Sequence, residues 1–212
     1  MKAGAGPWPL LLGEKMDKIE IINLALARIG VAAIERIDEP SEAARQAKAF
    51  YDHARRTVLR KYPWTFATRT SELALLPEKS TAYKYAYRYP ADALCLRRLY
   101  KIGSRKPWDR KYFKSASDKE GRTILTNMKF AEVEYTADIT DTTLFDDGFI
   151  EALSWKLAAE IAFALTGKIE LANNAVQAYN AYFVEAAGED AAEDREPEED
   201  VNTFAMARFV GW

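Results

Sequence analysis

The chain has few of the side chains on which most enzymes and metalloproteins rely. Cys95 is its only cysteine and His53 its only histidine in 212 residues. A single thiol forms no internal disulfide, and zinc sites built from several cysteines or histidines are excluded. This cysteine usage suits a reducing cytosol.

Neither sign of charge dominates the composition. The formal net charge is -2, with 29% charged and 49% apolar residues, as in globular proteins that bury a sizeable core. Histone-like binding of nucleic acid needs many cations to neutralise phosphates, so this balance excludes it. A local basic face remains compatible with the totals.

Secretory and membrane signals are also missing. Residues 1–16 contain Pro7 and Pro9 within a short apolar patch, which is not the continuous apolar run of a signal peptide. We expect a flexible N-terminal arm there. The apolar segment Phe149–Leu165 is too short and too charged to span a bilayer unaided, so no membrane partner is expected.

The sequence contains few motifs that are typical of catalysis. No Gly-rich phosphate loop is present, and His53 has no local nucleophile or orienting acid, so we expect it on a helix surface. Asp146 and Asp147 precede a helix, where acids cap free N–H groups. We assign no catalytic, metal or cofactor-binding residue and predict that the chain is not an enzyme. A glycan hydrolase using Asp146 or Glu134 is the alternative that paired carboxylates leave open.

Periodic apolar residues predict two helices in the first third of the chain. One covers residues 18–30 and stops at Gly30. The next has Ser41 as its N-cap and runs to Tyr62, where Pro63 ends it. Its small residues recur at spacings of three and four, so a close helix partner is expected.

The third predicted helix, at residues 146–166, is the most informative segment. It is apolar on almost every side, so neighbours must cover it on several sides, and we expect some of them in other subunits. A fourth helix at residues 168–187 is predicted to end at Gly188. Between Phe149 and Leu165 the only polar residues are Glu151, Ser154, Lys156 and Glu160.

The middle of the chain changes from helical periodicity to strand-like runs. Strands are expected from Trp64, at residues 94–102, at 122–126 and at 131–137. Asn127–Lys129 separate the last two runs, which predicts a hairpin. We therefore expect an antiparallel sheet in this region.

The order of elements predicts an α+β fold that is mainly α. Residues 17–63 and 141–188 would close into an antiparallel four-helix bundle. Residues 64–140 would form an inserted antiparallel β-rich domain. Residues 189–212 would follow as an extended C-terminal tail.

The C-terminal tail is first acidic and then apolar. Residues 189–200 contain eight acids and one base, a composition typical of solvated tethers. The chain then ends in apolar residues, which need a partner. Either this tail anchor orders when it meets another protein, or it packs back on its own sheet or bundle. The tail anchor consists of Phe204, Met206, Phe209 and Trp212.

A tyrosine-rich segment covers residues 83–89. Its tyrosines alternate along one face of a strand, with Lys84 and Arg88 on the other face. Aromatic residues interleaved with cations can stack on bases and follow phosphates. Tyrosines also suit sheet cores and protein interfaces, and the opposite directions of cations and tyrosines favour that second interpretation.

A basic run around residues 97–114 also contains aromatic residues. It is either a solvated hairpin face or a positive loop that meets DNA or an acidic partner. Together with residues 83–89 it defines an alternative function, a DNA-binding module. The run includes Trp108 and the four cations Arg105, Lys106, Arg110 and Lys111.

Four segments become informative when they are taken together. They are Asn23–Gly30, Arg55–Ala67, Tyr87–Asp92 and Tyr135–Ala162. In this order they resemble the tail tubular protein A family, the head-to-tail adaptors or gatekeepers of short-tailed phages. The resemblance covers roughly residues 17–187 and is most specific in Leu59–Ala67 and in the late apolar helix.

The resemblance implies a structural protein with no catalytic residues. Such proteins form a ring, usually a dodecamer, that joins the portal to the tail nozzle. Genomic DNA passes through the lumen without sequence-specific binding. The chain would then belong to the neck or tail of the virion, and to the host cytoplasm during assembly.

Three contact surfaces follow as hypotheses. The tail anchor would dock on the portal, with the acidic stretch as its tether. The four cations of the basic run would line the lumen or face DNA. A lateral or nozzle interface would be formed by Tyr83, Tyr85, Tyr87 and Trp108.

Overall fold

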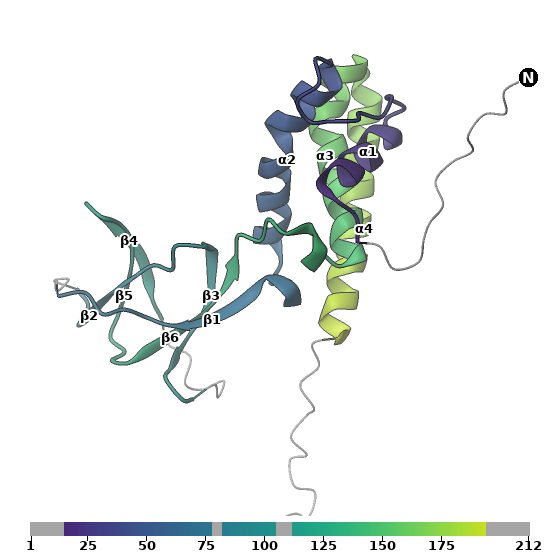
Figure 1. Cartoon of the computed structure of the whole chain (residues 1–212). Helices are drawn as coiled ribbons and strands as arrows, with labels where there is room; N and C mark the ends of the chain where they lie inside the picture. Colours follow the sequence, from purple (N-terminus) through teal and green to yellow (C-terminus); the bar gives the residue numbers. More distant parts are fainter. Residues whose placement is uncertain (1–14, 78–81, 105–111, 194–212) are drawn as a thin grey trace, which may run out of the picture.

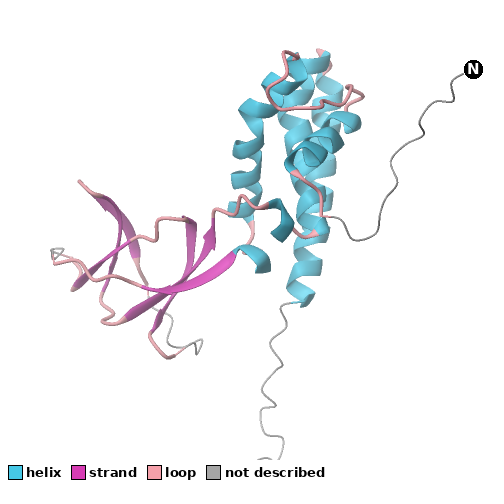
Figure 2. Ribbon diagram, viewed as in Figure 1, coloured by secondary structure: helices cyan, strands magenta, loops and turns pink. Residues whose placement is uncertain are grey.

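The computed structural model describes residues 15–77, 82–104 and 112–193. Within them, helices occupy both ends of the chain and strands its middle (Figure 1, Figure 2). The helices are α1 (Lys18–Arg28), α2 (Glu42–Lys61), α3 (Asp147–Thr166) and α4 (Ile169–Glu193). The strands are β1 (Thr68–Glu72), β2 (Tyr85–Arg88), β3 (Ala93–Lys101), β4 (Lys114–Asp118), β5 (Gly121–Thr126) and β6 (Ala131–Ala137). Short 3-10 turns, η1 (Thr65–Ala67) and η3 (Thr142–Leu144), precede β1 and α3.

The strands form two small antiparallel sheets rather than one. Their strand orders are β1-β6-β3 and β2-β5-β4. Successive strands β5 and β6 pair in different sheets, so the hairpin predicted across Asn127–Lys129 is wrong. Phe130 has a φ of 60° between them, a left-handed conformation that turns the chain from one sheet to the other.

Local signals fix most helix ends. The Ser41 hydroxyl oxygen accepts from the N–H of Ala44 at 3.1 Å, which confirms the predicted N-cap of α2. Gly167 ends α3 with a φ of 68°, a conformation that glycine adopts without strain. The predicted stop at Gly188 is wrong, because α4 continues to Glu193.

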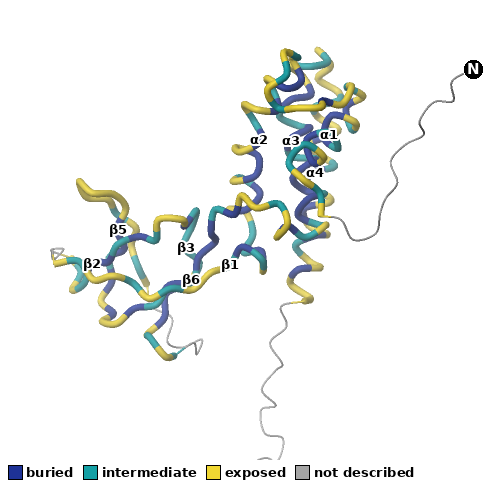
Figure 3. The backbone as a smooth tube through the Cα atoms, viewed as in Figure 1, coloured by how far each residue is buried: buried dark blue, intermediate teal, exposed yellow. Residues whose placement is uncertain are grey.

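Helix α3 is the centre of the helical part. Helices α1, α2 and α4 each have α3 as their main helical partner. Buried residues occur around most of the circumference of α3 (Figure 3). The cover that its apolar sequence requires therefore comes largely from within the same chain rather than from other subunits.

The predicted four-helix bundle with an inserted β-rich domain is wrong. Over the described residues, the fold is a mixed α/β arrangement of four helices and two three-stranded antiparallel sheets. Helix α1 has only 11 residues, and three helices pack around α3 instead of sharing one central seam. Buried residues of the strands belong to the same apolar core as those of the helices, so the sheets are not a separate inserted unit.

Gly148 marks a close approach of α3 to α4. A Cβ atom at this position would lie 2.8 Å from the Cβ of Ala186. We expect Gly148→Ala to destabilise the fold by about 1–3 kcal/mol, because overpacking outweighs the gain in helix propensity. Urea denaturation measures the change.

Gly188 of α4 provides the matched control, since a Cβ there would meet nothing within 4 Å. Gly188→Ala should stabilise the fold by about 0.5–1 kcal/mol, because alanine has less freedom to lose on folding. Equal effects of the two substitutions would contradict the packing of α3 on α4.

Candidate functional site

The helices and the sheets meet at a cluster of aromatic rings. Trp64 is fully buried, and its Nε1–H donates to the carbonyl of Val58 at 3.1 Å. Its ring packs edge-on against Phe149 of α3 and Phe183 of α4, with centroid distances of 5.3 Å and 6.0 Å. Phe66 in η1 lies 5.0 Å from Phe149. The segment that links α2 to β1 is thereby packed against both C-terminal helices.

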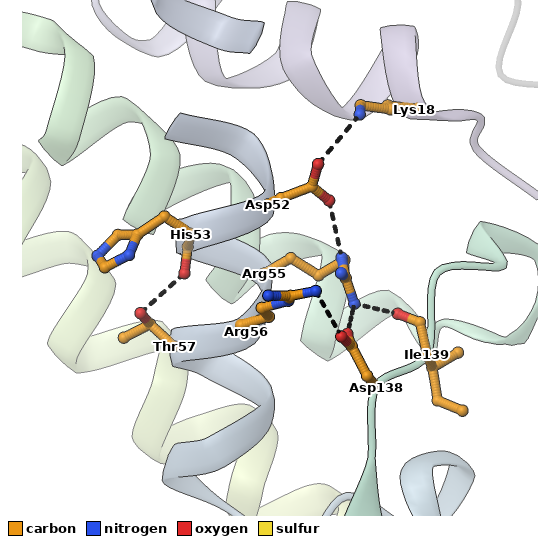
Figure 4. A network of polar contacts seen from close by, with 8 residues as sticks. All are labelled: Lys18, Asp52, His53, Arg55, Arg56, Thr57, Asp138 and Ile139. Carbon is orange, nitrogen blue, oxygen red and sulfur yellow. Dashed lines mark hydrogen bonds and ion pairs between the residues drawn. The ribbon is translucent and has the colours of Figure 1, made fainter. Parts of the chain in front are cut away.

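A second, polar contact joins α2 to the segment after β6 (Figure 4). The Arg55 side chain is 2% exposed and donates from Nη1 to Asp138 Oδ1 at 2.6 Å and to the carbonyl of Ile139 at 2.5 Å. Arg56 reaches the other oxygen of Asp138 at 2.8 Å. Asp52 approaches Arg55 Nε at 3.4 Å. The buried guanidinium is thus held from two sides, as a charge removed from water requires.

Two further arginines connect the end of α2 to the first sheet. Arg97 of β3 donates from Nη2 to the carbonyls of Leu59 and Arg60 at 3.3 Å and 3.0 Å. Its Nε–H also donates to Thr136 Oγ1 at 2.8 Å. Arg60 in turn donates to the carbonyl of Leu94 at 2.6 Å. Arg97, which the basic run had grouped with possible DNA contacts, instead satisfies carbonyls in the last turn of a helix.

Asp190 connects α4 to η1. Its carboxylate accepts hydrogen bonds from the N–H and from the Oγ1–H of Thr65, both at 3.1 Å. The residue is 8% exposed, although sequence analysis placed it in the solvated acidic tether. No local signal could have revealed the contact, because the two residues lie 125 positions apart. It holds α4 in place beyond the predicted end at Gly188.

Asp146 caps α3, which confirms the capping interpretation. Its Oδ1 accepts from the N–H of Phe149 at 2.6 Å. Burial raises the pKa of Asp146, and the charge of Asp190 adds to that rise, against the opposing effect of the Phe149 hydrogen bond. The helix start accounts for this carboxyl without any catalytic role.

The tyrosines proposed for a lateral or nozzle interface do not share one environment. Tyr87 is 2% exposed, and its hydroxyl donates to the carbonyl of Met128 at 2.9 Å. Its ring therefore belongs to the core and is not accessible to a partner. Tyr83 and Tyr85 are half-buried and keep accessible surface. Tyr83 also lies outside β2, which begins at Tyr85.

The other predicted contact residues lie outside the described residues. From the basic run these are Arg105, Lys106, Trp108, Arg110 and Lys111. From the tail anchor they are Phe204, Met206, Phe209 and Trp212.

Chemical sites are sparse in the described part of the chain. His53 is exposed on α2, as expected, and its carbonyl accepts from Thr57 Oγ1 at 2.8 Å (Figure 4). No three His, Cys, Asp or Glu side chains within residues 15–77, 82–104 and 112–193 are grouped so that they could hold a metal ion. A pocket of about 290 Å³ between α3 and α4 is lined mainly by acids. Among the described helices, none has the apolar length that crossing a membrane requires.

Two comparisons with known proteins found no match. No protein-family model matches the chain, and no curated protein matches it. A function must therefore be inferred from this chain's own residues and contacts.

The Arg55 contact predicts unequal effects of two substitutions at the same carboxylate. Asp138→Asn removes the closer of the two carboxylates beside the buried guanidinium, at 2.6 Å against 3.4 Å for Asp52, and we expect a loss of about 3 kcal/mol or more in the free energy of unfolding. Arg56→Ala removes the exposed partner (57% side-chain exposure) and should cost no more than about 1 kcal/mol. Urea denaturation of both variants tests the difference, and similar losses would show that Arg55 does not depend on this ion pair.

The raised pKa of Asp146 predicts a pH dependence of stability. The folded state holds this proton more tightly than the unfolded chain, so the stability linked to it is present in acid and is lost as pH rises through the folded pKa. Asparagine also caps helices but does not ionise. The stability of Asp146→Asn relative to the unsubstituted protein should therefore increase between about pH 3.5 and pH 7.

Asp141 supplies a control of opposite sign. Hydrogen bonds from Thr143 lower the pKa of Asp141, so its contribution to stability is lost as pH falls. The relative stability of Asp141→Asn should decrease as pH rises from about pH 2 to pH 5, because the change lies at and below the ordinary pKa of an aspartate. Thermal denaturation at several pH values measures both trends, and slopes of the same sign would contradict the burial of Asp146.

Proposed function

We propose that the chain is a structural virion protein, a head-to-tail adaptor of a short-tailed phage. It would form a ring, dodecameric in the manner of the family it resembles, that joins the portal to the tail nozzle. Genomic DNA would pass through the lumen without sequence-specific recognition. A closed ring multiplies modest subunit contacts into a stable joint.

One observation carries this proposal: the first three segments behind the resemblance each contact the fourth. Arg28 in the first donates to the Glu151 carbonyl at 3.1 Å and pairs with its carboxylate at 2.6 Å. The second supplies Arg55 and the third Asp92, whose carboxylate accepts from the Tyr135 hydroxyl at 3.1 Å. All of them thus meet the fourth segment, Tyr135–Ala162.

This convergence gives the resemblance a physical basis. Segments that are far apart in sequence but contact each other in the fold constrain each other, whereas isolated matches would not. Taken together, the four segments therefore support the adaptor proposal more than any one motif does.

The β-region offers surfaces for lateral or nozzle contacts. Leu75, Tyr112 and Phe130 are exposed large apolar side chains, at 56%, 98% and 60%. Exposed aromatic residues of this kind are typical of protein interfaces. They join Tyr83 and Tyr85 as candidate contact residues and replace the buried Tyr87.

The alternative DNA-binding module gains no comparable support. Base stacking needs accessible rings, but Tyr87 and Tyr89 are 2% and 7% exposed. The guanidinium of Arg122 already covers the ring of Tyr89 at 3.6 Å. The tyrosine segment therefore contributes to the sheet rather than to a platform for nucleotides.

Co-expression with the portal protein of the phage that encodes the chain tests the adaptor proposal. We expect a portal-bound ring, and native mass spectrometry gives its copy number. Deletion of residues 201–212 should abolish binding if the tail anchor docks on the portal, whereas deletion of residues 1–14 is the control and should leave it intact. Absence of any complex between the full chain and the portal would refute the proposal.

A further inference from the structure

One side of α4 is open to solvent and carries no charge. Ile169, Val176 and Val184 are 58%, 46% and 70% exposed. They belong to a line of residues at spacings of three and four, the spacing of a helix–helix seam. We call it the α4 seam: Ile169, Asn173, Val176, Asn180, Val184, Ala187 and Ala191.

The α4 seam lies beside the face of α4 that packs on its own chain. With 100° between successive residues, it is turned by about 100° from the buried residues Ala175, Tyr179 and Phe183. The exposed side of α2 is different, since it carries Arg45, Lys48 and Arg56. An uncharged, partly apolar line on an otherwise charged surface favours a helix as its partner over nucleic acid or an ionic ligand.

We infer that the partner is α4 of a second copy, packed antiparallel across a two-fold axis at Asn180. In this register Ile169 faces Ala191, Asn173 faces Ala187, and Val176 faces Val184. The larger residues of one half of the seam meet the smaller residues of the other half, so the surface is self-complementary. A parallel pair would instead place Ile169 against Ile169 and leave a gap between facing alanines.

The Asn180 side chains and the dipoles of the two α4 helices are also consistent with antiparallel packing. The two Asn180 amides meet at the axis, where each can donate to and accept from the other. A single central asparagine pair is also a device that selects one register in paired helices. Antiparallel packing places opposite ends of the two helix dipoles side by side.

The size of the seam predicts a weak dimer. From Ile169 to Ala191 the helix rises about 33 Å, and with a width of about 10–12 Å each copy buries roughly 350–400 Å². A standard stable interface buries about 800 Å² on each partner. We therefore expect a weak dimer that forms at high protein concentration and dissociates on dilution.

This dimer is distinct from the proposed ring. A two-fold contact uses the same patch on both copies, whereas a cyclic ring needs two different patches. The dimer would be the form of the unassembled chain at high concentration. Its existence does not depend on the adaptor proposal, and a test without portal protein keeps the two apart.

Sedimentation equilibrium of the full chain between about 1 and 200 µM tests the inference. The unsubstituted protein should shift from monomer to dimer over this range. Val176→Glu and Val184→Lys each place a charge opposite an apolar side chain, and each should weaken the dimer at least about tenfold. Both positions are exposed in the monomer, so circular dichroism should show an unchanged fold.

The double variant Val176→Glu/Val184→Lys tests the direction of packing. In the antiparallel register each glutamate faces a lysine, and dimerisation should recover at least about fivefold over either single variant. Ala49→Glu, on the outer side of α2, is the matched control and should dimerise like the unsubstituted chain. A monomer at 200 µM, single variants that dimerise normally, or a double variant weaker than both singles would overturn the inference.

Discussion

The burial of Trp64 is the constraint on which the rest of the structure depends. This one side chain contacts rings of α3 and α4. Its single N–H group donates to the carbonyl of Val58 in α2. The chain leaves α2 and enters the first sheet at this residue. Its position therefore fixes where the sheets begin relative to the helices.

Polar contacts around the junction at Trp64 determine how the helices and the sheets are oriented relative to one another. Arg55 and Asp190 are buried charged residues, and each is satisfied by groups from a distant segment. Buried charges add little net stability because desolvation offsets their attraction, but an alternative arrangement would leave them unpaired. In the adaptor proposal this rigidity matters, since a ring closes only if every subunit holds the same shape.

Much of the local structure could be predicted from sequence. Ser41 and Pro63 act over a few neighbouring residues, so the ends of α2 were expected correctly, and α3 ends at Thr166 as predicted. The all-round apolar character of α3 predicted cover on several sides, but it did not show that this cover comes from helices of the same chain. Strand pairing could not be predicted, because β5 and β6 are adjacent in sequence and their patterns do not say which sheet each joins.

The candidate contact residues were also hard to predict, because their surroundings depend on segments that are distant in sequence. Alternation left Tyr87 to either a sheet core or a protein interface, and the hydrogen bond to the carbonyl of Met128 and the packing of the second sheet place it in the core. Arg97 and Asp190 looked like solvated charges, and only contacts with distant residues reveal their roles. Periodicity assigns faces to an element, but it does not identify what covers each face.

The central claim is that helices and sheets form one cooperative unit through this junction. Hydrogen exchange measured by mass spectrometry across a urea series tests it directly, because it reports α3 and β6 separately in the same sample. The account predicts that both segments lose protection at the same urea concentration. Loss of protection in the strands well below the concentration that unfolds α3 would contradict it.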